Sequence, residues 1–225
     1  MPPITKEDFM NNVLETLWRY SVDFPVSREK GCNPDFTALV VKLLSDHDAY
    51  SIPVSIDNVY QGLGIRLVQD DFIAQGEEEG LLGYIIAIDD GLISEERPYS
   101  IVAAVRSTDP VELKRITAGH ELYHAIYDMR EELRKNGASA MSIRMESTSF
   151  DENEVIANEF AAQFLMPVAK LIDAFNKLPA KSVRVLSNIF GVPSEEMVKR
   201  LRNLGITNYI DDGIPLSERR QVCDC

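Results

Sequence analysis

Cysteine is scarce in this chain of 225 residues, which has only Cys32, Cys223 and Cys225. An odd and widely spaced set of thiols provides no disulfide framework. A chain of this length can bury most of the surface that it exposes when unfolded, so apolar packing is enough to stabilise it. The sequence therefore predicts a globular fold without structural disulfides.

Long apolar runs are missing as well. No stretch reaches the roughly 18 apolar residues that cross a bilayer. The opening residues, MPPITKEDFM, do not contain a basic segment followed by an apolar one, which is the pattern of a secretory signal. These absences predict a cytoplasmic protein that has no membrane partner.

Basic residues are outnumbered by acidic ones. There are 23 Lys and Arg residues against 36 Asp and Glu residues, and the formal net charge is −13. Proteins that bind nucleic acids gain affinity from Lys and Arg side chains that replace counterions on phosphates. We therefore expect no nucleic acid among the partners of this chain, and its charge suits basic protein segments better.

The pattern of apolar residues and helix breakers divides the chain into four segments. We expect a helical N-terminal extension over 1–50 and a core over 53–170. Further helices over 171–206 are expected to complete the domain, and 207–225 form a polar tail. No internal repeat or low-complexity tract interrupts this order.

The first half of the core is expected to form strands. A short helix should end at Gly62 or Gly64 and be followed directly by a strand. Two stretches rich in β-branched residues, 83–88 and 99–106, predict a pair of strands with a long connection. The sheet should be small and mostly antiparallel.

The second half of the core is expected to form two helices. Asp109 is suited to cap a helix that runs to about residue 130, with Pro110 as its first residue. Asp151 is suited to cap a second helix that Pro167 terminates. The polar residues 131–150 between them are expected to form a connector. Together with the strands, these helices predict the α+β class.

The first of these helices carries the motif His-Glu-x-x-His. His120 and His124 are four residues apart, so they share one helical face with Cβ atoms about 6 Å apart and can aim two imidazole nitrogens at one metal ion. Glu121 lies about a third of a turn away, from where it can reach a water on the metal. The alternative is a partly buried helix whose histidines are ordinary hydrogen-bonding residues.

Two histidines leave a zinc site incomplete, because catalytic zinc takes three protein ligands and a water. The remaining histidine, His47, lies between two aspartates and is expected to be a solvated surface residue. A carboxylate is the expected third ligand, and Glu154 is the first candidate, because small residues on its stripe let the two helices pack closely. Glu152 and Glu159 are the fallback ligands. Glu154 could instead be only the capping carboxylate of its own helix.

Two stretches of the sequence carry a family resemblance. RITAGHELYHAIY followed by EVIANEFAAQFLMP resembles the ImmA/IrrE family of zinc metallopeptidases, which pairs a His-Glu-x-x-His helix with a downstream Glu-x-x-Ala-Asn/Asp-x-Phe-Ala helix ending in Leu-Met-Pro. The resemblance extends over roughly residues 53–206, and residues 1–50 lie outside it. It implies a zincin-like core of two helices packed on the sheet, with additional N- and C-terminal helices.

The resemblance implies a cytoplasmic endopeptidase that uses Zn²⁺ and acts on a protein substrate, such as a helix-turn-helix repressor. Carried over by position, His120, His124 and Glu154 are the metal ligands and Glu121 is the general base. Tyr123 departs from the family, which usually has glycine before the second histidine. We expect Tyr123 to stand near the mouth of the cleft and to form part of its wall.

Two other functions stay open at this point. A chain that binds metal but has lost turnover would serve as a regulatory or interaction module. One segment has the helix, glycine-containing turn and helix of a helix-turn-helix motif, and it is the segment best suited to contact DNA through Lys199, Arg200 and Arg202: LSNIFGVPSEEMVKRLRNLGI. The net charge of the chain argues against DNA binding.

Overall fold

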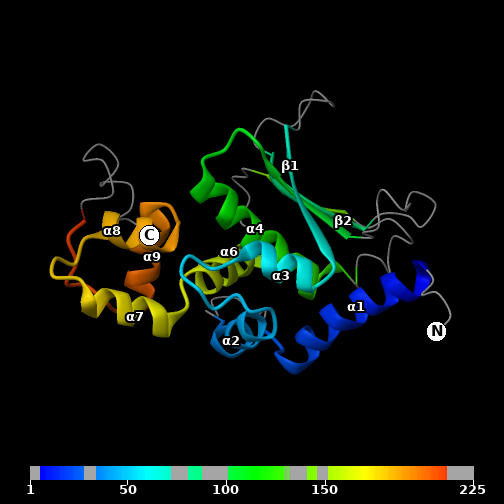
Figure 1. The fold of residues 1–225 in the computed structure, drawn as a ribbon, viewed down its shortest axis with the longest axis horizontal. Helices are drawn as coiled ribbons and strands as arrows, with labels where there is room; N and C mark the ends of the chain where they lie inside the picture. The colour runs from blue at the N-terminus through cyan, green and yellow to red at the C-terminus, as the bar shows by residue number, and fades with distance from the viewer. Residues whose placement is uncertain are drawn as a thin grey trace.

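The computed structural model describes residues 6–27, 34–71, 81–87, 101–129, 131, 141–145 and 152–211. Within these ranges a small sheet packs against a helical body, which confirms the α+β class. Figure 1 shows the sheet to one side of α4, with α7, α8 and α9 gathered at one end of the molecule and α1 toward the other end.

Eight helices and four strands make up the described part of the chain. The helices that precede the His-Glu-x-x-His motif are α1 (Lys6–Asp23), α2 (Thr37–Asp46) and α3 (Ile56–Gly62). The helices from the motif onward are α4 (Val111–Tyr127), α6 (Glu152–Leu165), α7 (Val168–Lys177), α8 (Val183–Phe190) and α9 (Ser194–Asn203). The strands are β1 (Ile65–Asp70), β2 (Leu81–Ala87), β3 (Ile101–Arg106) and β4 (Met141–Met145).

The four strands lie in the order β1-β3-β2-β4. β1 pairs with β3 in parallel, whereas β2 pairs antiparallel with both β3 and β4. The antiparallel pairing of β2 with β3 confirms the strand pair predicted at 83–88 and 99–106. β4 was not predicted: its sequence MSIRM alternates apolar and polar residues, but it lies inside the stretch 131–150, which was expected to be a polar connector.

The helix α4 lies at the centre of the fold. It packs against β2 and β3 of the sheet and against α6 (Figure 1). Every residue from Ile116 to Ile126 is buried as a result. The two helices lie close together at Gly119, where an added Cβ would be 3.2 Å from Cβ of Ala161. This confirms that small side chains let the two helices pack closely.

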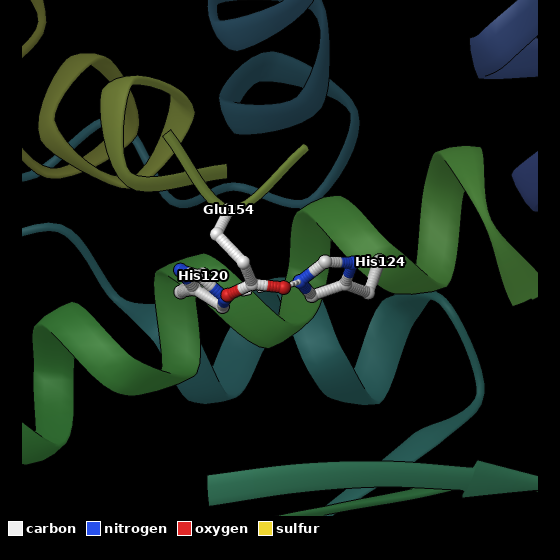
Figure 2. Close-up of side chains that lie close together, drawn as sticks. All are labelled: His120, His124 and Glu154. Carbon is white, nitrogen blue, oxygen red and sulfur yellow. Dashed lines mark hydrogen bonds and ion pairs between the residues drawn. The ribbon is translucent and has the colours of Figure 1, made fainter. Parts of the chain in front are cut away.

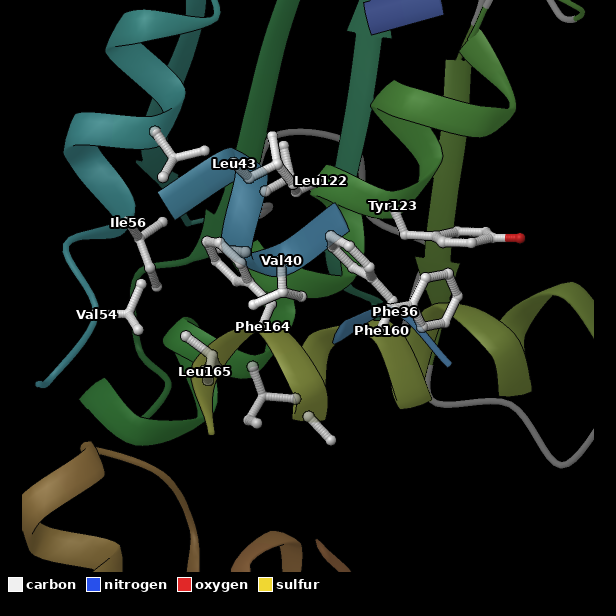
Figure 3. Close-up of a cluster of buried hydrophobic side chains, with 14 of the residues drawn as sticks. Phe36, Val40, Leu43, Val54, Ile56, Leu122, Tyr123, Phe160, Phe164 and Leu165 are labelled. Carbon is white, nitrogen blue, oxygen red and sulfur yellow. The ribbon is translucent and has the colours of Figure 1, made fainter. Parts of the chain in front are cut away.

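The segment that precedes α2 is built into the same core. Figure 3 shows Phe36 beside Tyr123 and Phe160, and the Phe36 and Phe160 rings meet edge to face at 5.2 Å between centroids. The Gln163 amide holds this segment in place, since it accepts a hydrogen bond from the backbone N–H of Phe36 and donates one to the carbonyl of Pro34. How the chain divides into domains stays a prediction.

The C-terminal helices are joined to α4 through Arg115. Its guanidinium donates to the carbonyl oxygens of Gly191 and Val54, both at 3.0 Å, and so links the turn between α8 and α9 to the segment before α3. Gly191 ends α8 with φ of +64°, a left-handed conformation in which a side chain would be strained.

The start of α4 differs from its prediction by one residue. Pro110 occupies the cap position and the helix begins at Val111. The carboxylate of Asp109 accepts a hydrogen bond from Nε of Arg106 at 2.7 Å, so it does not cap the helix. The expected cap at Asp151, like the three cysteines, lies outside the described residues.

Among the helices of the described residues, no single one is long and apolar enough to cross a membrane. The bent pair of α6 and α7 meets the length and composition requirement together. α6 is a core helix, however, and eight of its residues are buried against neighbouring elements.

Candidate metal centre

Three side chains from two helices converge on one point. His120 and His124 extend from the same face of α4, and Glu154 reaches them from the first turn of α6 (Figure 2). The Nε2 atoms of the two histidines are 3.0 Å apart. The Glu154 carboxylate lies 3.0 Å from Nε2 of His120 through Oε2 and 3.4 Å from Nε2 of His124 through Oε1. Glu154 is therefore directed toward the histidines and not toward its own helix end.

The other nitrogen of each imidazole is held by an oxygen acceptor. Nδ1 of His124 lies 2.7 Å from the Asp128 carboxylate, and Nδ1 of His120 lies 2.9 Å from Oδ1 of Asn158. Because carboxylate and amide oxygens accept, each Nδ1 carries a proton, and each Nε2 is the nitrogen that faces the centre. Metal-binding histidines are oriented by outer partners of this kind.

The converging atoms have the spacing and the chemistry of a metal site. A tetrahedral zinc ion with bonds near 2.1 Å places its ligand atoms roughly 3.4 Å apart, close to the separations seen here. Two imidazole lone pairs and a carboxylate this close together repel one another unless a proton or a cation lies among them. The residues present therefore fit a divalent metal ion with nitrogen and oxygen ligands.

The protonation of this cluster follows the same electrostatics. Burial lowers the pKa of His124, but hydrogen bonds to Asp128 and Glu154 and the charge of Glu121 outweigh it and raise the pKa to about 9. Burial alone would raise the pKa of Glu154, yet the hydrogen bonds from His120 and His124 hold it well below its usual range. The cluster attracts positive charge, and a metal ion binding there has to displace the His124 proton.

Solvent reaches the cluster from one side. His120 is completely buried and His124 nearly so, whereas the side chain of Glu154 is 29% exposed. The site is thus closed on the α4 side, and its exposed part lies at Glu154 of α6. A third protein ligand combined with an open approach is the arrangement that catalytic metal sites require.

Glu121 lies on the sheet side of α4. It is completely buried, and its Oε1 would be 3.2 Å from a Cβ atom added to Gly83 of β2. Its negative charge raises the pKa of both His124 and the buried Tyr60, although burial is the first cause for Tyr60. The carboxylate therefore lies within electrostatic reach of the metal cluster and under β2.

Gly83 leaves the space that this arrangement needs. A Cβ at this position would lie 2.4 Å from Cγ2 of Thr117 and 2.9 Å from the carbonyl oxygen of Ala104. We expect Gly83→Ala to lower the free energy of unfolding by about 1–3 kcal/mol, the usual cost of overpacking a core. Thermal and urea unfolding would measure this, with Gly119→Ala as a milder comparison because its closest contact is at 3.2 Å. An unchanged stability would mean that α4 and β2 can move apart.

The fallback ligands take no part in the cluster. Glu152 is exposed in the first turn of α6. Glu159 is occupied elsewhere, because its carboxylate accepts hydrogen bonds from Gln163 at 2.9 Å and from Asn203 at 3.0 Å. His47 is partly buried, with its Nε2 3.4 Å from the hydroxyl of Tyr20, so it is not a fully solvated residue.

Tyr123 is a residue of the hydrophobic core. It is completely buried, with its ring against Phe36 and Phe160 and nearly perpendicular to the His124 ring, at 5.5 Å between centroids. The expectation that it stands at the mouth of a cleft is therefore wrong. The reason is that α4 is covered both by the sheet and by α6, so a residue next to His124 along the helix faces packed side chains and not solvent.

Asp128 and Asn158 were missed in the sequence, although a signal was present. Each lies four residues after a metal-ligand candidate on the same helix, at the spacing that brings side chains together. His120, His124 and Asp128 thus form one row on α4, and Glu154 and Asn158 form another on α6. Extending the four-residue spacing by one step would have found both.

We expect Asp128→Ala to weaken zinc binding by about 10–100-fold, the usual effect of losing an outer partner of a histidine ligand. Asp128→Asn should cost less, because the amide oxygen can still accept from Nδ1 of His124. A competition titration with a coloured chelator measures both affinities. Glu112→Gln, an exposed change on the same helix, is the control. Equal affinity in Asp128→Ala and the control would contradict the role of Asp128.

Comparison with known proteins supports a family assignment. Residues 91–202 match the model of the IrrE N-terminal-like domain, Peptidase_M78. No curated protein matches the chain. Among solved structures, a Mycobacterium tuberculosis transcriptional regulator aligns with 85% of this chain at 14% identity and a TM-score of 0.37. The chain covers 46% of that regulator, which is less than half of its length.

Proposed function

The chain belongs to the IrrE N-terminal-like family through residues 91–202, and on this premise we propose that it is a zinc-dependent endopeptidase. The observation that carries the proposal is the convergence of His120, His124 and Glu154 from two packed helices. A site used only for structural metal would be closed by a fourth protein ligand. Among the described residues, the group suited to hold a metal has three members, and the side chain of Glu154 is partly exposed.

Each residue of the site has a distinct role in the proposed reaction. His120, His124 and Glu154 would hold the metal, and Asp128 and Asn158 would keep the two imidazoles in the tautomer that presents Nε2. When bound, zinc would supply Lewis acidity that activates a water molecule and polarises the scissile carbonyl.

Glu121 is the proposed general base. It would accept a proton from the water molecule that attacks the carbonyl carbon of the peptide bond. As the bond between carbon and nitrogen breaks, Glu121 would pass this proton to the leaving amine. Its burial under β2 keeps bulk water away from the carboxylate, and its negative charge near His124 is consistent with a position beside the metal.

A protein substrate in the cytoplasm, such as a helix-turn-helix repressor, is the finer form of the proposal. The family resemblance supports it, and the acidic surface suits a basic substrate segment. DNA binding through α8 and α9 is less well supported. Arg200 of α9 is buried, donates to the carbonyl of Met166 and faces Glu159, so it is not available to a phosphate.

The second candidate function is a metal-binding regulatory module without turnover. It would share the His120, His124 and Glu154 cluster, and the burial of Glu121 under β2 favours it if water does not reach that carboxylate. Turnover of an unstructured protein separates the two candidates, because the module would hold zinc and cleave nothing.

The first test combines metal content with hydrolysis. We expect the purified chain to contain close to one zinc per molecule by mass spectrometry and to cleave fluorescently labelled casein. Removal of zinc with a chelator should abolish cleavage, and zinc added back should restore it. Zinc without cleavage would favour the regulatory module. No zinc, even after its addition, would contradict both candidates and leave α4 as an ordinary core helix.

A further inference from the structure

β4 is contributed by the segment that joins the two helices of the metal cluster. It follows α4, which carries the histidines, and precedes α6, which carries Glu154. It runs antiparallel to β2 and forms the outer strand of the sheet on that side. A segment tied at both ends to the candidate site thus covers one edge of the neighbouring strand.

The edge that β4 covers is the one nearest the proposed base. Gly83 of β2 lies against the Glu121 carboxylate, and the residue paired with Gly83 across the ladder is Arg144 of β4. β3 pairs with the other side of β2. Without β4, the backbone groups on the near side of β2 would be free to pair with an extended peptide, which is how many proteins hold such a ligand.

The pairing of β4 with β2 is short and irregular. β4 has five residues, and the register shifts between Leu81 and Gly83, where β2 advances by two residues while β4 advances by one. Such irregularities interrupt the hydrogen-bond ladder and are common beside active sites. The pairing is therefore weakest next to Glu121.

The metal cluster does not depend on β4. α4 and α6 pack directly on each other, with Gly119 against Ala161, and the main packing partner of β4 in the described chain is β2. β4 can therefore leave the sheet without separating His120, His124 and Glu154.

We propose that β4 occupies the position of the substrate on the edge of β2. β4 pairs with β2 beside Glu121, and an extended peptide displaces it by adding to the same edge. The proposal rests on the proposed peptidase function. A covered edge keeps the site closed to extended chains until one competes successfully, and it also protects an exposed strand from pairing with other molecules. In this arrangement, the competition between β4 and the substrate sets the activity of the resting chain.

The test uses the β4 sequence itself as a probe. Ser142→Pro/Ile143→Pro removes two consecutive N–H donors, and because successive N–H groups point to opposite sides of a strand, one of them faces β2. Ser142→Ala/Ile143→Val keeps both donors and is the matched control. A fluorescent synthetic peptide that spans residues 139–147 is titrated into the full chain by anisotropy, with zinc content and thermal unfolding recorded for each variant.

The expected result is peptide binding to the proline variant at least 10-fold tighter than to the wild type or to the control, together with casein cleavage that is at least 10-fold faster and that the peptide inhibits. Equal binding to all three chains would overturn the proposal. So would tight binding that leaves casein cleavage unaffected, because the edge would then not be the substrate edge. If the peptide binds as expected but no chain cleaves casein, the peptidase function fails and β4 remains a displaceable strand.

If the proline variant does not fold, amide hydrogen exchange of the wild-type chain tests the proposal instead. A large excess of the same peptide should speed amide exchange in Met141–Met145, while the amides of β2 stay protected because the peptide takes the place of β4. Exchange in β4 that does not change at high peptide concentration would overturn the proposal.

Discussion

Glu121→Gln is expected to keep one zinc per chain and to slow casein cleavage by about 10²–10⁴-fold, the usual contribution of a general base. Glutamine has almost the same shape as glutamate, so the contact with Gly83 is preserved, but its amide cannot accept the proton of the attacking water. The variant also replaces a completely buried charge by a neutral group, so we expect no loss of thermal stability.

Three measurements on this variant separate its roles. Zinc content reports on the metal ligands, thermal unfolding reports on the fold, and the rate of casein cleavage reports on the base. Glu112→Gln is the matched control, because it makes the same change at an exposed position of α4. Cleavage at the wild-type rate would remove Glu121 from the mechanism. Loss of zinc together with cleavage would mean that Glu121 belongs to the metal site itself.

Glu154→Ala is expected to lose zinc. Removal of a direct ligand should weaken binding by more than the roughly 10–100-fold that follows the loss of an outer partner. The variant also removes the hydrogen bonds to Nε2 of His120 and His124 that help to raise the pKa of His124. Zinc content after dialysis and the chelator competition titration measure the effect directly.

The fold provides a close control for this change. Glu152→Ala removes a carboxylate from the same turn of α6, at an exposed position outside the cluster, and should bind zinc like the wild type. Zinc should raise the midpoint of thermal unfolding in the wild type and in Glu152→Ala, but not in Glu154→Ala, because a ligand stabilises only the state that binds it. Full zinc content in Glu154→Ala would show that another group completes the site.

The residues of the metal cluster could be predicted because their spacing is local. In a helix, four residues return a side chain to the same face, so His120 and His124 had to be neighbours wherever α4 packed. Glu154 needed a second inference, namely that two helices with small residues pack closely, and the contact of Gly119 with Ala161 confirms it. The same helical spacing indicates Asp128 and Asn158, although neither residue was predicted.

The environment of each residue was decided only by the tertiary structure. Tyr123 is next to His124 in sequence, yet its burial depends on Phe36 and Phe160, which come from distant parts of the chain. β4 also depends on a distant contact, since its alternating sequence MSIRM is held as a strand by pairing with the edge of β2.

The sequence by itself thus determined the α+β class, the family and which side chains share a helical face, because these depend on spacing along the chain. The tertiary structure alone decided which groups are buried, which nitrogen of each histidine faces the centre and which strand lies over Glu121. Those properties arise from contacts between elements far apart in sequence, and helical or strand periodicity carries no information about them.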